Sequence, residues 1–152
     1  MAANVGGASV SPMKSVLRGS CLCGVVTYEI SEPFLSFVHC HCSRCRKATG
    51  SAHATNLRVP AGQFTWTSGQ EKSVRFDLPE AQSFATTFCS CCGSPLPHLT
   101  RSGRSVIVPA GSLDGEPSER PSCRPQCHAF WDSRSSWSCG ESDLPRVAEA
   151  AF

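Results

Sequence analysis

The stretch FCSCCG, residues 88–93, decides how this chain folds. Cys89 and Cys92 stand three positions apart and Gly93 follows them, which is the pattern of a rubredoxin-like knuckle, a turn that points two thiolates at one ion. A tetrahedral zinc ion needs four ligands, so this turn requires two more. The earlier pair Cys21 and Cys23 can supply them from a neighbouring hairpin. The result is a closed site of four thiolates, in which the free energy of zinc binding stabilises the fold.

A third group of cysteines lies between these two pairs, in HCHCSRC at residues 39–45. Cys40, Cys42 and Cys45 place three thiolates within six residues, with no obvious fourth partner nearby. Three protein ligands leave zinc with an open position, where water or a substrate thiol can bind and be acidified. We therefore expect a reactive zinc ion here, with His39 and His41 as alternative ligands or as hydrogen-bond donors behind the ligands.

The cysteine content favours metal over disulfides. The chain has 152 residues, 11 of them cysteine. Residues 1–14 lack the apolar core of a secretion signal, and no apolar run approaches the roughly 18 residues that span a bilayer. We therefore predict a cytoplasmic protein without a membrane partner, whose thiols stay reduced and bind two zinc ions per chain. The formal net charge of +2 is too small for a nucleic-acid footprint, so we expect no nucleic-acid partner.

Composition and local pattern predict an all-β domain. Charged residues make up only 17% of the chain, beside 12 glycines and 11 prolines, a balance that favours short strands and turns. The segment SRCRKAT, residues 43–49, is closed by Gly50 and predicts a short helical turn directly after the middle cysteines. The predicted strands, mostly β-branched or alternating, are 25–30, 35–39, 53–59, 63–67, 73–76, 83–88 and 105–108.

The same patterns set the expected domain limits. We expect a disordered tail over residues 1–14, one antiparallel domain over residues 15–146, and a C-terminal tail over residues 147–152. Residues 114–124 have the composition of an exposed loop. The aromatic segment after them, residues 128–137, is expected to pack back on the domain because its rings would be costly to leave in water.

Four motifs together resemble the glutathione-dependent formaldehyde-activating enzyme family. They are GSCLCG (19–24), HCHCSRCRKATG (39–50), FCSCCGSPL (88–96) and PQCHAFWDSRSSW (125–137). The resemblance covers roughly residues 19–146 and implies a β-tent, in which antiparallel sheets are linked by zinc. The structural zinc would use Cys21, Cys23, Cys89 and Cys92, and the catalytic zinc Cys40, Cys42 and Cys45.

The resemblance also implies a function. The family's activity is a carbon–sulfur lyase reaction that joins formaldehyde to glutathione, so we expect a zinc-dependent lyase acting on thiol adducts of formaldehyde or other small carbonyl compounds. The chain departs from the family pattern at Thr86-Thr87, where an arginine is usual, and at residues 134–137, where KAPW is frequent. One alternative is another lyase, hydrolase or isomerase reaction at the same metal. A second is a non-catalytic zinc module that binds a protein partner.

Several further residues are candidates for the site. His53 is a candidate for acid–base catalysis, beside the plainer role of a histidine hydrogen-bonded for packing. Basic side chains that could bind the carboxylates of glutathione are Arg44, Arg46 and Lys47. Trp131 and Trp137 could line a substrate pocket or seal the edge of a core. Four cysteines have no place in the ligand pattern: Cys91, Cys123, Cys127 and Cys139. Cys139 would be the nucleophile if the chain instead worked like a methionine sulfoxide reductase.

Overall fold

The computed structural model describes residues 15–115 and 123–138. The two predicted tails and Cys139 lie outside the described residues. The strands of the described part are β1 (Val16–Ser20), β2 (Thr27–Ser31), β3 (Ser36–Cys40), β4 (Ala54–Pro60), β5 (Phe64–Ser68), β6 (Ser73–Asp77), β7 (Ala85–Cys89), β8 (Pro95–Leu96), β9 (His98–Leu99), β10 (Ser105–Pro109) and β11 (Cys127–Ala129). Its helices are α1 (Ser43–Thr49) and the short 3-10 turns η1 (Ala61–Gln63), η2 (Gln70–Lys72), η3 (Ala110–Ser112) and η5 (Trp131–Ser133).

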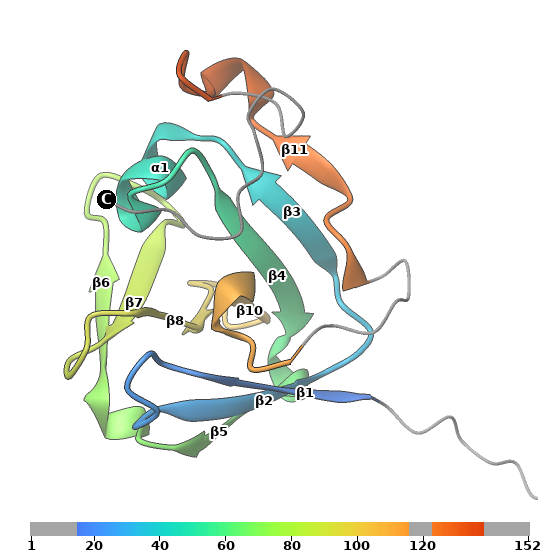
Figure 1. The fold of residues 1–152 in the computed structure, drawn as a ribbon, viewed down its shortest axis with the longest axis vertical. Coiled ribbons are helices and arrows are strands. Elements are labelled where there is room, and N and C mark those ends of the chain that lie inside the picture. The colour runs from blue at the N-terminus through green and yellow to red at the C-terminus, as the bar shows by residue number, and fades with distance from the viewer. Residues whose placement is uncertain (1–14, 116–122, 139–152) are drawn as a thin grey trace, which may run out of the picture.

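The described strands form three sheets, with the orders β1-β2-β5, β11-β3-β4-β10-β9 and β6-β7-β8. In Figure 1 these sheets make three sides of a tent, with β1, β2 and β5 along the bottom, β6 and β7 on the left, and β3 and β4 on the upper right. Neighbouring strands are antiparallel except at one edge, where β11 runs parallel to β3. The all-β class and the β-tent are therefore confirmed, with one parallel edge strand.

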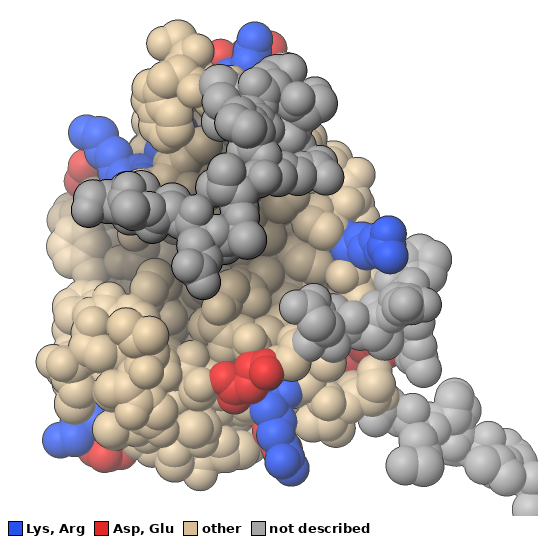
Figure 2. Space-filling view, viewed as in Figure 1, with Lys and Arg blue, Asp and Glu red and all other residues tan. Residues whose placement is uncertain are grey.

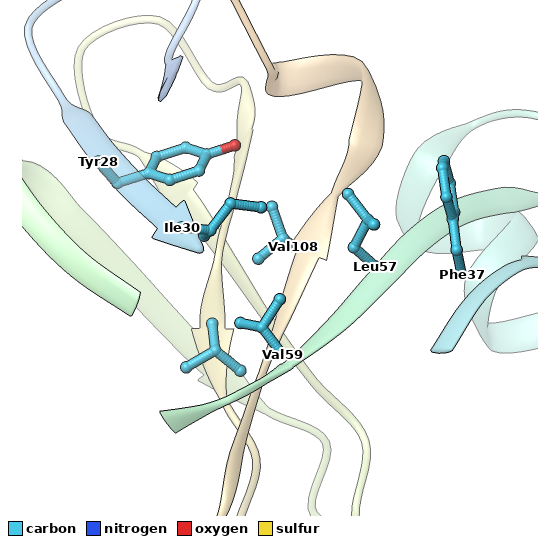
Figure 3. Packing of buried hydrophobic residues seen from close by; sticks show 7 residues of the cluster. Tyr28, Ile30, Phe37, Leu57, Val59 and Val108 are labelled. Atoms are coloured by element: carbon cyan, nitrogen blue, oxygen red, sulfur yellow. The ribbon is translucent and has the colours of Figure 1, made fainter. Parts of the chain in front are cut away.

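The main core lies between the first two sheets. Tyr28 and Ile30 of β2 point toward Leu57 and Val59 of β4, as the close view of Figure 3 shows. Residues two apart on a strand share one face, so each strand contributes alternate side chains to this core. All four side chains are at most 1% exposed, and each stabilises the fold by roughly 1.5–3 kcal/mol through burial.

The elements predicted from the sequence are present. Each of the seven predicted strands lies within two residues of its observed bounds. The helical turn at residues 43–49 is also confirmed, with Cys42 as its N-cap and Gly50 in the left-handed conformation at its end. The strands that sequence patterns missed are β1, β8, β9 and β11. β1, β8 and β9 have two to five residues and lack a clear alternation, and β11 follows a proline-rich stretch of sequence.

The end of the described chain differs from expectation in one respect. The segment 123–138 does pack back on the domain, since β11 pairs with β3. Its large aromatic side chains nevertheless stay at the surface, with Phe130 66%, Trp131 45% and Trp137 65% exposed. The packing of the segment on the domain is therefore confirmed, but the expected reason was wrong, because these rings stay exposed and the backbone of β11 pairs with β3.

The surface carries few charges. On the face seen in Figure 2, the Lys, Arg, Asp and Glu side chains stand singly or in small groups of mixed sign among uncharged residues. On β6, Arg75 donates two hydrogen bonds to the carboxylate of Asp77, both 2.8 Å long. Within the described residues, no helix has the length and apolar character needed to cross a membrane.

Candidate metal centres

The four-cysteine cluster consists of Cys21, Cys23, Cys89 and Cys92. The four Sγ atoms lie within 4.8 Å of one another, and those of Cys21 and Cys23 are 3.4 Å apart. Zinc–sulfur bonds of about 2.3 Å place the sulfurs of a tetrahedral site about 3.8 Å from one another. The donor set and its spacing therefore fit zinc. The cluster joins the turn after β1 to the turn after β7, and so links two sheets of the tent.

Both turns of the four-cysteine cluster end in a glycine that follows the second ligand. Gly24 follows Cys23 and Gly93 follows Cys92, and both glycines have a positive φ, of 74° and 73°. A Cβ atom at either position would meet nothing within 4 Å, so the backbone conformation rather than lack of space requires glycine here. In each turn, the glycine N–H donates to the carbonyl of the first cysteine, at 2.9 Å for Cys21 and 2.8 Å for Cys89.

Ser94 supports this cluster and was not anticipated from the sequence. Its hydroxyl accepts a hydrogen bond of 3.0 Å from the backbone N–H of Leu22 and lies 3.1 Å from Sγ of Cys92. Hydrogen bonds from the side chain and the backbone of Ser94 lower the pKa of Cys92 to about 6. Ser94 thus connects the two turns and favours the thiolate that a metal ion needs. The sequence signal that could have indicated this role is a serine directly after Cys-x-x-Cys-Gly.

The three-cysteine cluster consists of Cys40, Cys42 and Cys45. Cys40 ends β3, Cys42 caps α1, and Cys45 lies in the first turn of that helix, so one short segment supplies all three thiols. Their Sγ atoms also lie within 4.8 Å of one another. Among the described residues, this group includes no histidine nitrogen and no fourth donor. The donor set fits a zinc ion with three protein ligands and an open fourth position.

The thiols of this cluster differ in acidity. Burial would raise the pKa of Cys42, but hydrogen bonds from the backbone N–H of Cys45 and from the neighbouring thiols lower it. Burial raises the pKa of Cys45, and the closeness of Cys40 raises it further. Cys42 is therefore the thiol of this cluster that the fold favours as a thiolate.

Four of the five histidines meet beside the three-cysteine cluster. The ring of His39 lies 4.4 Å from that of His53 and 5.2 Å from that of His128, measured between centroids. The ring of His41 lies 5.1 Å from each of the same two rings. Both His39 and His53 approach the Thr55 hydroxyl, with Nδ1–Oγ1 distances of 2.9 and 3.3 Å. The structure thus places His53, His39 and His41 in one group with His128.

The basic residues predicted to bind carboxylates take two different positions. Arg44 and Lys47 are exposed on α1. Arg46 is half-buried, and its guanidinium donates to the carbonyl of His41 and to the hydroxyl of Ser135. Arg46 therefore joins α1 to the end of the described chain, whereas Arg44 and Lys47 face solvent.

Comparisons with known proteins agree with this site. The model of the glutathione-dependent formaldehyde-activating enzyme family matches residues 16–133. The chain belongs to this family. A curated protein of Halomonas elongata that bears the name of the same family is 29% identical over 126 residues, which cover 80% of this chain and 79% of that protein. A crystal structure of a Rhodobacter sphaeroides protein is 25% identical with a TM-score of 0.55, and the match covers 67% of this chain and 92% of that one.

Further cysteines of this family member lie apart from both clusters. Cys91 and Cys127 are exposed. Cys123 is buried, and its thiol donates a hydrogen bond of 3.1 Å to the buried carboxylate of Glu32. The ten described cysteines are all free of disulfides. Since Cys123 and Cys127 do not join a metal-binding group, the described part of the chain keeps its candidate metal ligands in two clusters.

A groove of about 540 Å³ lies beside the four-cysteine cluster. Cys21, Leu22, Ser94 and Asp114 are among the residues that line it, and none of the three-cysteine cluster does. Its walls lack the open thiolate set that lyase chemistry would need. The chemistry of the donors, rather than the volume of the groove, therefore identifies the three-cysteine cluster as the candidate reactive centre.

Proposed function

We propose that this chain is a zinc-dependent carbon–sulfur lyase that acts on the adduct of glutathione, or of another small thiol, with formaldehyde or a similar small carbonyl compound. The observation that carries the proposal is the three-cysteine cluster, a set of three thiols with no fourth protein donor among the described residues. Family membership supports glutathione and formaldehyde as the substrate class. The four-cysteine cluster would hold a second, structural zinc ion.

Zinc bound by Cys40, Cys42 and Cys45 would supply the acidification of a substrate thiol, because a free position on the ion accepts the sulfur as thiolate. In the synthetic direction, a carbon–sulfur bond forms between this sulfur and the carbonyl carbon, and the thiol proton ends on the carbonyl oxygen. The chain's own part is to hold the three ligands in one short segment and to orient the substrate beside them.

The neighbouring side chains fit the remaining tasks. His53 is half-buried in the histidine group, from which we propose that it transfers the proton to or from the carbonyl oxygen. Arg44 and Lys47 are exposed on α1, the helix that carries Cys45, and we propose that they bind the carboxylates of glutathione. Ten free thiols in the described chain suit the reducing cytoplasm, which we propose as its location.

The proposal can be tested by NMR exchange spectroscopy of a mixture of formaldehyde and glutathione, together with calorimetry of glutathione binding. Zinc-loaded protein should bind glutathione saturably and accelerate exchange between the free and adduct forms. S-Methylglutathione, which lacks the thiol, is the matched control. It should neither react with formaldehyde nor displace bound glutathione. If glutathione neither binds nor exchanges faster, the lyase proposal fails. If a small carbonyl compound then binds without glutathione, another lyase, hydrolase or isomerase reaction at the same metal becomes the better interpretation.

A further inference from the structure

The residue between two candidate zinc ligands, His41, is fixed from three sides. Side chains alternate along extended backbone, so the thiols of Cys40 and Cys42 share one side while the imidazole of His41 points to the other. The His41 ring is 1% exposed. Its backbone N–H donates to the carbonyl of Ala129 at 2.9 Å, and its carbonyl accepts from Arg46 at 3.3 Å.

The His41 ring itself contacts two side chains of the C-terminal segment, residues 123–138. Nε2 of His41 lies 2.9 Å from Nδ1 of His128 on β11, a hydrogen bond between two imidazoles. Trp131 packs edge-on against His41, with ring centroids 4.9 Å apart and an interplanar angle of 85°. The guanidinium of Arg134 covers the Trp131 ring at 4.6 Å from its centroid. His41 is thus held by a hydrogen bond and by a ring contact.

The C-terminal segment is attached along its length. At its start, the Cys123 thiol bonds to the Glu32 carboxylate. Next, Gln126 donates its backbone N–H to Phe37 at 2.8 Å and accepts the Phe37 N–H on its side chain at 3.2 Å. Near its end, the buried Ser135 accepts from Arg46. Because the segment is anchored in this way, its side chains can hold the residues that they contact, such as His41, in one position.

The histidines themselves are poorly placed to bind a metal ion. Among the described residues, only the two cysteine clusters bring three or more ligand atoms within 4.8 Å of one another. Ring nitrogens of His39 and His53 bond to the hydroxyl of Thr55, and Nε2 of His41 bonds to Nδ1 of His128. The histidine group therefore suits a supporting role for the neighbouring thiols better than a third metal site.

We propose that His128 and Trp131 are positioning residues of the three-cysteine cluster, which act through His41 to hold Cys40 and Cys42 in the geometry of a metal site. This inference rests on the proposed function, because it requires a zinc ion at that cluster. Among the residues that the structure describes, no fourth protein donor fixes the arrangement of the three ligands, so the support comes from the C-terminal segment. Mutation of a group that orients a metal ligand typically lowers metal affinity or activity about 10–100-fold.

Zinc release to a chromogenic chelator tests the proposal without any turnover. His128→Leu removes the hydrogen bond to His41, whereas His128→Asn keeps an amide near the position of Nδ1. We expect His128→Leu to release one zinc equivalent about 10–100-fold faster than the unmodified protein and the other equivalent at an unchanged rate. His128→Asn should restore much of the slow release. Phe130→Asn, at an exposed ring on the same segment, should release both equivalents at the original rates.

The outcomes separate this inference from the proposed function. If the unmodified protein holds a single zinc equivalent, the proposed function fails. If it holds two and His128→Leu releases both at the original rates, the positioning role is overturned while the proposed function stands. Should His128→Leu not fold, Trp131→Leu tests the same support from a partly exposed position. Unchanged release from a folded Trp131→Leu protein would likewise overturn the inference.

Discussion

The four-cysteine and three-cysteine clusters differ in how far apart their ligands lie in the sequence. The first joins residues 21 and 23 to residues 89 and 92, from turns that belong to different sheets. The second takes all its thiols from residues 40–45, at one junction of strand and helix. Both clusters combine buried and more accessible thiols, since Cys23 is exposed in the first and Cys40 is buried in the second.

This difference indicates what each metal ion can do. An ion that joins distant segments closes a long loop, so its binding free energy becomes folding free energy. An ion bound within six residues closes almost no loop and can leave without separating the sheets. Because the described residues offer it three ligands and leave one position open, it can instead meet a substrate. Under the proposed function, the cysteine side chain would stabilise the fold in one cluster and take part in the chemistry in the other.

The largest effect is expected from Cys92→Ser, which removes one ligand of the ion that links two sheets. The free energy of unfolding should fall by on the order of 5 kcal/mol or more, enough to unfold or aggregate the domain, because the other three thiols lose their metal. Circular dichroism and size-exclusion chromatography would report this loss. A soluble Cys92→Ser protein with unchanged melting temperature would remove the distinction between the two clusters.

Cys42→Ser should leave the fold intact and abolish turnover. It removes one of three local ligands, so the open site should lose its zinc while the four-cysteine cluster keeps its own. Metal analysis should find one zinc ion per chain instead of two, with a melting temperature near that of the unmodified protein. Full activity would show that this cluster is not the catalyst. Unfolding would show that it is structural, and a binding module would then be the better interpretation.

Acid should weaken the fold at a position outside both clusters, in β9. Burial lowers the pKa of His98 to about 4, and the positive charge of Arg75 contributes. The unfolded state then binds the proton first, so the stability due to neutral His98 is complete above about pH 6.5 and is lost as the pH falls toward 4. Between pH 7 and pH 5, His98→Gln should therefore lose about 1–2 kcal/mol less of its free energy of unfolding than the unmodified protein loses.

Protons also compete with zinc for the thiolates, and this effect is the same in the unmodified protein and in His98→Gln. Chemical denaturation of the unmodified and His98→Gln proteins at the two pH values therefore isolates the histidine. Equal losses of stability in both would assign acid sensitivity to the thiolates alone.

The smallest effect is expected from Cys91→Ser, the control for the first prediction. Cys91 lies next to Cys92 but is exposed and outside both clusters. The change should alter the free energy of unfolding by no more than about 0.5 kcal/mol and leave two zinc ions bound. Loss of a zinc ion from this variant would mean that the knuckle uses a different pair of thiols.

The sequence predicted the parts of the fold that local chemistry determines. The spacing of Cys89 and Cys92 before Gly93 indicated a metal-binding turn, and the structure brings the thiols of Cys21 and Cys23 to it. The helix over residues 43–49 followed from its cap and its terminal glycine. In each case the residues that predict the turn or the helix are also the residues that form it, so their spacing in the sequence was enough to predict it.

The parts that sequence reasoning missed depend on contacts between distant segments. His128 lies 87 positions from His41, and Ser135 lies 89 positions from Arg46. Nothing in the local pattern of β11 shows that it pairs in parallel with β3, since a strand of three residues has almost no periodicity. Ser94 was missed because a serine near a knuckle has many local partners to choose from.

The late position of β11 in the chain has a consequence for the protein during its synthesis. Translation delivers the chain from its N-terminus, so β3 and the cysteines that follow it leave the ribosome long before β11 exists. The four-cysteine cluster has all its ligands once residue 92 has emerged, whereas Gln126 must still travel to a partner 89 positions upstream. A nascent chain can therefore bring its linked sheets together first and complete the surroundings of the three-cysteine cluster only when β11 has followed.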